Sequence, residues 1–306
     1  MRSKMMLGAM LVTGAATMSS ASVVVVMNET FENPSYSTTL GLSTIPGAPF
    51  KREAGSPANH HVVADDSAGI GSGMAMSFSN NSGNQAREIL HFTNTPAVVG
   101  PNVGDNVKLS FQVRLNGTPA NSTSGFRFVL SDSRGTEQGN PYPNAQTAQN
   151  GADDDRGLYM SLATGTTAAN SPLAFKQLAG NLHAHTFGGL GTMPPGVTNI
   201  NGTGTYVATT INDQLTHLVE ALITRTATGL AYSLSLDNVV VASASATRTS
   251  AAFIQQFDQI AFGTGFVEMP NIRIDNITLT QTVIPEPASL SLLALGGLML
   301  GRRRRA

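Results

Sequence analysis

The 306-residue sequence contains no cysteine, so any chemistry must come from oxygen and nitrogen side chains. Thiolate nucleophiles, thiolate metal ligands and disulfides are therefore excluded. Two glutamates, Glu29 and Glu32, lie near the N-terminus, and Asp275 lies near the C-terminus. Sites with two or three carboxylates suit Ca²⁺, which takes oxygen ligands. The alternative for Glu29 and Glu32 is that they are solvated residues at the end of a strand.

A second group of residues at the C-terminus, 282–306, is typical of a membrane-targeting tail. Pro285, Glu286 and Pro287 are followed by the uncharged stretch 288–301. As a helix this stretch would span about 21 Å at ~1.5 Å per residue, which is short for a bilayer core of about 30 Å. By the positive-inside rule, the basic end of the tail stays on the cytoplasmic side and the body lies outside the inner membrane. That basic end consists of Arg302, Arg303, Arg304 and Arg305.

This tail resembles the PEP-CTERM sorting signal of Gram-negative, exopolysaccharide-producing bacteria. The resemblance implies recognition by an exosortase, a membrane-embedded cysteine transpeptidase that cuts near residues 285–287. Those three residues are then a substrate site and not a catalytic one. The protein would be anchored transiently in the inner membrane and then released or attached at the cell surface or in the extracellular matrix.

The N-terminus predicts a secretory signal over residues 1–21. Arg2 and Lys4 supply a basic start, residues 5–18 are apolar and small, and small residues precede Ser22. We expect signal peptidase to cleave after Ala21. The alternative, an uncleaved anchor, is disfavoured because the apolar run is shorter than the ~20 residues of a spanning helix.

Charge restricts the partners of the body between these two signals. Charged residues are 12% of the chain, against roughly 25% in an ordinary soluble domain. Residues 22–284 carry 12 basic and 18 acidic residues, a net charge of −6. This balance excludes binding to a phosphate backbone by counterion release, so we expect no nucleic acid partner.

The body, 22–281, alternates apolar and polar residues with turn residues between, which indicates strands. The clearest strand is 107–115, whose odd positions are all apolar. A tight turn at Asp237-Asn238 joins 230–236 to 239–241. The other expected strands are 23–27, 74–79, 89–93, 126–131, 158–162, 206–211, 218–226, 257–262 and 272–279. We predict an all-β fold, a two-sheet antiparallel sandwich.

The last third of the body, roughly 205–280, resembles concanavalin A-like (laminin G-type) jelly rolls. The resemblance lies in 217–223, Gly229, 232–238 and 272–277, where Asn238 replaces the usual glycine. In many carbohydrate-binding jelly rolls the first and last strands pair, and acidic residues there hold a structural Ca²⁺. The resemblance therefore implies Glu29, Glu32 and Asp275 as ligands.

Three hypotheses for the body follow. The first is a non-enzymatic surface or matrix protein that contacts extracellular polysaccharide, with Tyr142, between two prolines, as an exposed sugar-contacting candidate. The second is a glycan-active enzyme of the same fold. β-Glucan hydrolases of that fold resemble the laminarinase family and need Glu-x-Asp-x-x-Glu on one strand, which the sequence lacks; we therefore predict no enzyme. The third is a purely structural matrix protein.

Overall fold

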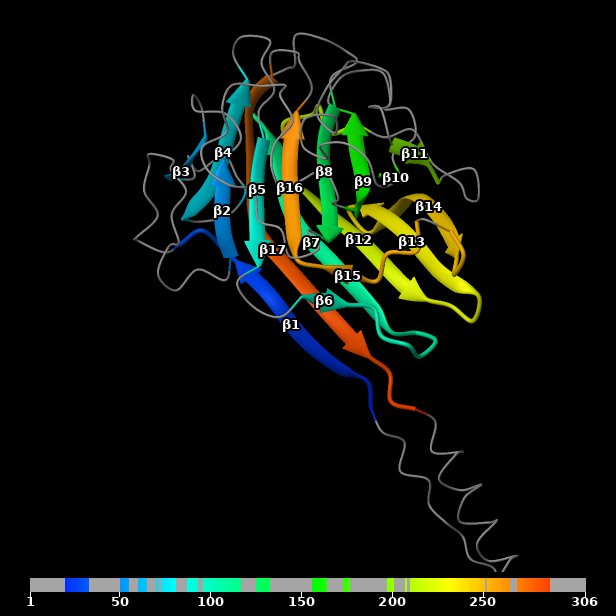
Figure 1. Ribbon diagram of the computed structural model, residues 1–306. Helices are drawn as coiled ribbons and strands as arrows, with labels where there is room; N and C mark the ends of the chain where they lie inside the picture. The colour runs from blue at the N-terminus through cyan, green and yellow to red at the C-terminus, as the bar shows by residue number, and fades with distance from the viewer. Residues whose placement is uncertain are drawn as a thin grey trace, which may run out of the picture.

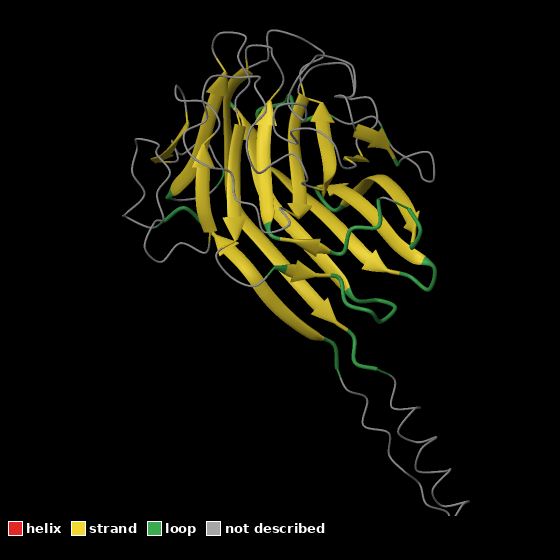
Figure 2. Cartoon of the chain, viewed as in Figure 1, coloured by secondary structure: helices red, strands yellow, loops and turns green. Residues whose placement is uncertain are grey.

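The fold is seen in a computed structural model in which every regular element among the described residues is a strand (Figure 2). The structure describes residues 20–32, 50–54, 60–64, 70, 73–80, 87–92, 96–116, 125–132, 156–163, 173–176, 197–200, 207, 210–250, 252–264 and 269–286. The strands are β1 (Ser22–Glu29), β2 (Phe50–Ala54), β3 (His60–Ala64), β4 (Met74–Asn80), β5 (Arg87–Phe92), β6 (Ala97–Val98), β7 (Asn106–Leu115), β8 (Gly125–Asp132), β9 (Arg156–Ala163), β10 (Leu173–Lys176), β11 (Val197–Asn199), β12 (His217–Arg225), β13 (Gly229–Leu236), β14 (Val239–Thr247), β15 (Gln256–Phe257), β16 (Gln259–Thr264) and β17 (Met269–Val283).

Two antiparallel sheets make up the body (Figure 1). The eight-stranded sheet has the order β14-β13-β12-β7-β17-β4-β3, and β1 pairs with β17. The seven-stranded sheet has the order β11-β10-β9-β8-β16-β5-β2. A short pair, β15-β6, completes the fold. The predicted all-β, two-sheet antiparallel sandwich is therefore confirmed, and so is the pairing of the first strand with the last.

The period-two pattern read from the sequence is reproduced in the burial of the central strands. Residues of β7 alternate between half-buried and buried along all ten positions, and β12 alternates in the same way. The buried residues of the two strands are register partners, as Phe111 opposite Val219 illustrates. One face of this sheet therefore packs into the core, while the other carries polar side chains such as Lys108 and Glu220, which form an ion pair.

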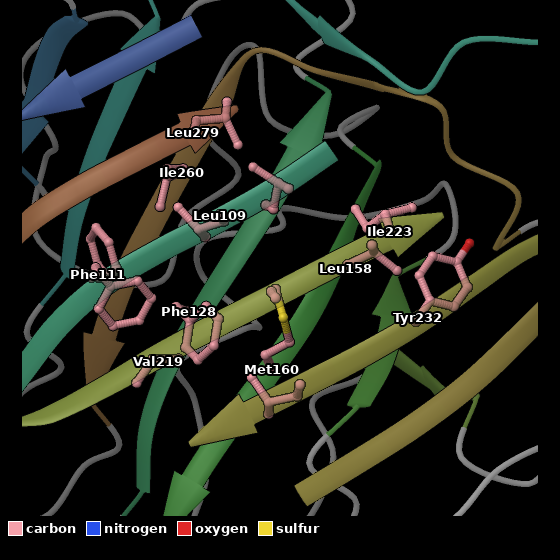
Figure 3. Close-up of a cluster of buried hydrophobic side chains, with 14 of the residues drawn as sticks. Leu109, Phe111, Phe128, Leu158, Met160, Val219, Ile223, Tyr232, Ile260 and Leu279 are labelled. Carbon is pink, nitrogen blue, oxygen red and sulfur yellow. The ribbon is translucent and has the colours of Figure 1, made fainter. Parts of the chain in front are cut away.

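Aromatic rings from both sheets fill the centre of the core (Figure 3). Phe111 of β7 lies edge-on to three rings of the opposite sheet, with centroid distances of 6.0 Å to Phe126, 5.0 Å to Phe128 and 5.2 Å to Phe262. Edge-to-face geometry of this kind adds to the hydrophobic stabilisation from burial. Leu109 and Met160, from opposite sheets, also belong to this buried cluster.

The hairpin at Asp237-Asn238 is confirmed. Both residues have positive φ, 50° and 66°, which is the backbone of the two-residue turn favoured between antiparallel strands. The single strand expected at 257–262 is wrong. Asp258 separates β15 from β16, and its N–H donates to the carbonyl of Ser131 at 2.9 Å. Residues 206, 208 and 209 of the expected strand 206–211 lie outside the described residues.

Five short strands were not expected from the sequence. They are β2, β3, β6, β10 and β11, and each has five residues or fewer. Strands this short carry too few alternating positions to give a period-two pattern. Four of them, β2, β3, β10 and β11, lie at or near the margins of the two large sheets, where pairing on fewer sides tolerates charged and small residues.

Candidate functional site

Both ends of the body leave the sandwich side by side. Ser22, the first residue of β1, is the register partner of Val283, the last residue of β17 (Figure 1). The expected N-terminus after signal removal and the start of the predicted tail therefore lie at one end of the molecule. Pro285 and Glu286 are described, and Glu286 is exposed.

A buried carboxylate holds the chain at this exit. Asp105 is 0% exposed, and its Oδ1 accepts the N–H of Ile284 at 2.6 Å. Its Oδ2 accepts the N–H of Asn102 at 2.8 Å. The Asn102 side-chain amide donates to the carbonyl of Ile284, also at 2.8 Å. The residue before Pro285 is thus bonded through both its backbone groups. We call Asp105, Asn102 and Ile284 the exit clamp.

The loop of the exit clamp leaves little room for other residues. A Cβ on Gly100 would lie 2.3 Å from Oδ2 of Asp105, and Gly104 has a φ of +97° that favours glycine. Backbone bonds in both directions tie the loop to the end of β12: Gly104 N–H to the Arg225 carbonyl at 3.0 Å, and Arg225 N–H to the Asp105 carbonyl at 2.8 Å. The clamp is therefore part of the rigid sandwich.

The three residues predicted to bind calcium come from one junction, where β1, β4 and β17 meet. β17 pairs with β4 up to Ile274 and with β1 from Ile277 onward. The register with β7 shifts between Asp275 and Thr278, and Asn276 has a φ of 53°. This bulge interrupts the ladder and leaves backbone groups that need other partners.

Carboxylates accept backbone N–H groups around this junction. Oε1 of Glu29 accepts the N–H of Phe31, and Oε1 of Glu32 accepts the N–H of Met74 at 2.7 Å. Oδ1 of Asp275 accepts the N–H of Asn276 at 2.7 Å. Glu29 is 5% exposed, so the alternative of a solvated side chain is wrong for it, whereas Glu32 is exposed.

Within the part of the chain that the structure describes, no group of three or more histidine, aspartate or glutamate side chains is arranged to hold a metal ion. The three junction carboxylates therefore do not form a ready metal centre in this structure. Calcium binding at Glu29, Glu32 and Asp275 stays a prediction.

A row of polar side chains lies on the outer face of the seven-stranded sheet, the face turned away from the core. Arg127 of β8 is the register partner of Ser161 of β9, and Ser131 of β8 is the partner of Gln259 of β16. All four are buried, between 0% and 6% exposed, although none belongs to the core cluster. We call these four residues, together with Tyr159, the polar row.

The polar row offers hydrogen-bonding groups and one cation. Burial raises the pKa of Tyr159, and the positive charge of Arg127 offsets part of that rise, so the phenol stays protonated and can donate. The hydroxyl of Ser131 is buried and has no hydrogen-bond partner among the described residues. The outward positions described in β8, β9 and β16 include no carboxylate. The row can therefore bind polar groups, but its described residues hold no acid pair.

A third cluster lies at the start of β12, at the opposite end of that strand from Arg225 and the exit clamp. His217 bonds Asp237 through Nδ1 and Asp213 through Nε2, both at 2.8 Å. Burial alone would lower the pKa of His217, but the bonds and charges of the two aspartates outweigh it and raise the pKa above its usual value. When the imidazole is protonated, both ring nitrogens donate to the two carboxylates, and the cluster then fixes the start of β12.

Several predicted residues lie outside the described part of the chain. These are Tyr142, Pro287, the arginines 302–305, the segment 288–301 and residues 1–19. Among the described residues, no helix is long and apolar enough to cross a membrane. The sequence reasoning missed Asp105, Arg127 and His217. The turn residues 101–105, Pro-Asn-Val-Gly-Asp, are the one local signal that pointed to a structured loop around Asp105.

Comparisons with known proteins find only solved structures of low similarity. No family model matches the sequence, and no curated protein matches it significantly. The structure is similar to a protein of unknown function with a galectin-like fold from Bacillus subtilis, at 9% identity and a TM-score of 0.43, over 82% of this chain and 99% of that one.

Two further solved structures are similar to the same degree. Peanut lectin with a nine-residue peptide has 9% identity and a TM-score of 0.41, over 88% of this chain and 100% of that one. An endo-1,3-β-glucanase from Streptomyces sioyaensis has 12% identity and a TM-score of 0.42, over 86% and 97%. At these values the fold assignment rests on the sheet order, and the similarities carry no argument about activity.

Proposed function

We propose that this chain is an exported bacterial surface protein with a non-enzymatic jelly-roll body of the concanavalin A-like type. Its C-terminal tail holds it transiently in the inner membrane until an exosortase removes the tail at residues 285–287. The body then stays at the cell surface or in the extracellular matrix, where it contacts polysaccharide. Signal peptidase and exosortase are its partners during export.

The observation that carries this proposal is the exit clamp. A surface protein that is tethered and then cut needs a stable body and an accessible linker close to it. Asp105 bonds the backbone of Ile284, and the next residues, Pro285 and Glu286, leave the sandwich, with Glu286 exposed. The last residue bonded by the clamp is therefore the residue directly before the motif. The signal-like 1–21 and the uncharged 288–301 followed by arginines support the same conclusion from the sequence.

Mass spectrometry tests the sorting step. The full chain is produced in a Gram-negative host that has an exosortase, and the mass of the surface fraction is compared with that of the triple variant P285A/E286A/P287A. We expect the wild type to lose about 20 C-terminal residues and the variant to keep them in the membrane fraction. Equal masses for the two proteins would refute sorting through this motif.

The polar row supports the polysaccharide contact. Sugar hydroxyls are neutral hydrogen-bonding groups, and the row holds hydroxyls, an amide and a guanidinium outside the core cluster, although Arg127, Ser131, Ser161 and Gln259 are each at most 6% exposed in this structure. The buried Ser131 hydroxyl has no described partner, and a buried polar group of this kind favours a ligand or water that completes its bonding. The outward positions described in β8, β9 and β16 carry no carboxylate, and hydrolysis needs an acid pair, so we infer binding at the polar row and not hydrolysis.

A pull-down on exopolysaccharide tests this contact with a matched pair of variants. S131A removes the hydroxyl from the polar row, and S233A removes one from the outer face of the eight-stranded sheet, where Ser233 is half-buried. We expect weaker retention of S131A and no change for S233A, with and without Ca²⁺. If the wild-type protein is not retained at all, the body has a purely structural role, and if it releases reducing sugar it is a glycan-active enzyme.

A further inference from the structure

The first residues of β1 expose an unusual run of apolar side chains. Val23, Val24 and Val25 are 62%, 50% and 59% exposed. Because successive side chains of a strand point to opposite faces, exposure of all three means that neither face is covered there. Further along the same strand Met27 and Glu29 are buried. β1 therefore projects beyond the sandwich at its start, side by side with the end of β17 (Figure 1).

Val103 belongs to the same end of the molecule. It is 62% exposed and lies in the loop of the exit clamp, between Asn102, which bonds Ile284, and Gly104, which lies against the Ile284 side chain. We call Val23, Val24, Val25 and Val103 the valine end. The register partners of the three β1 valines on β17 are Thr282, Gln281 and Thr280, so the strand beside them carries no charge opposite these valines.

The chain leaves the sandwich at Ile284, next to the valine end. The exit clamp fixes Ile284, and only 285–287 separate it from the uncharged stretch 288–301. Four extended residue steps reach at most about 14 Å. When that stretch lies in a bilayer, the clamp therefore holds Ile284, which borders the valine end, within about 14 Å of the first inserted residue.

We infer that the valine end is a membrane-contacting surface, which rests on the lipid interface while the tail is inserted. This inference depends on the proposed function, because it requires residues 288–301 to enter a membrane. Exposed apolar residues next to an anchoring segment gain from contact with the interface, where side chains reach the boundary between headgroups and acyl chains. Lipid can cover the exposed side chains on both faces of β1, whereas another strand that paired with β1 would cover only its edge.

The lack of tryptophan in the chain allows a clean test with one introduced probe. V103W places a single indole at the valine end. L215W is the matched control, because Leu215 is also 62% exposed. It precedes His217, which pairs with Val113, whereas Val103 precedes Asn106, at the other end of β7. The seven residue steps of β7 from Asn106 to Val113 place about 23 Å along the sheet between the two ends that the probes flank.

The full chain with either probe is reconstituted in phosphatidylethanolamine–phosphatidylglycerol vesicles that contain a lipid brominated near its headgroup. We expect V103W to emit at shorter wavelength than L215W and to be quenched about twofold more strongly, since interfacial side chains lie ~5–10 Å into the bilayer. V24W repeats the measurement from β1 and covers the case in which V103W misfolds. Circular dichroism checks the strand content of each variant.

The possible outcomes distinguish failure of lipid contact at the valine end from failure of the proposed tail anchor. If the chain resists carbonate extraction but V103W and V24W are quenched no more than L215W, the valine end does not contact lipid while the tail anchor stands. If the chain is extracted, both the anchor and the inference are overturned. If V103W emission shifts with protein concentration in detergent alone, the valine end binds a second copy, which also overturns the inference.

Discussion

Replacement of Asp105 by asparagine tests the exit clamp directly. The carboxylate accepts the N–H of Ile284 and that of Asn102, and an asparagine keeps only one accepting oxygen. A hydrogen bond to a buried charged acceptor is worth about 1.5–3 kcal/mol. Loss of this amount at Ile284 would increase local opening about 10- to 150-fold, since 1.4 kcal/mol is one factor of ten. We expect D105N to accelerate native-state hydrogen exchange of the Ile284 amide by this factor.

N102A provides the comparison for D105N. It removes the neutral bond from the Asn102 side chain to the Ile284 carbonyl but leaves the Asn102 N–H for Asp105. A neutral bond is worth about 1 kcal/mol, so exchange of the Ile284 amide should rise only about fivefold. The reasoning would be refuted if exchange at Ile284 in D105N were as slow as in the wild type, or no faster than in N102A.

Three further predictions concern the core, a titrating cluster and a metal. Phe111→Ala should lower the free energy of unfolding, measured by urea denaturation, by about 3–5 kcal/mol. The reason is that the 0% exposed ring of Phe111 contacts three other rings. A loss under ~1 kcal/mol would contradict this packing. The raised pKa of His217 contributes stability that is full below its unfolded pKa of about 6.5 and is lost as pH rises through the folded value. The urea midpoint of the wild type should therefore fall as pH rises, and H217Q should fall less steeply. An equally steep fall of the midpoint in H217Q would count against this prediction. If calcium occupies the junction of Glu29 and Asp275, chelation should lower the melting temperature of the wild type, and the absence of any shift would end that prediction.

The central strands were predictable because their two faces meet different surroundings. In β7 the residues at odd positions from Val107 to Leu115 face the core and those between them face polar surroundings, so burial and sequence share a period of two. β8 is different, because Phe126 and Arg127 are both buried. Its sequence could place it in a strand but could not say that its polar face is enclosed as well.

The clamp and the polar row depend on contacts between residues far apart in the sequence. Asp105 and Ile284 are separated by 179 positions, and no local pattern connects them. Arg127 and Ser161 become neighbours only through the register of β8 with β9. Glu29 and Asp275 lie in one region because the first and last strands pair, but residue type alone could not decide what their oxygens bind.

Carboxylates in this charge-poor chain gather where strands start, end or break. Among the described residues, acids whose side chains accept a backbone N–H include Glu29, Glu32, Asp105, Asp213, Asp237 and Asp275. Each of these donors lies at a bulge, a turn, a strand start or the exit of the chain, where no ladder partner is present, and an anionic acceptor makes the stronger bond there. A calcium ion at the β1–β17 junction would have to compete with these amides for the same oxygens. The role of a carboxylate in this fold is therefore set first by the backbone, and any metal comes second.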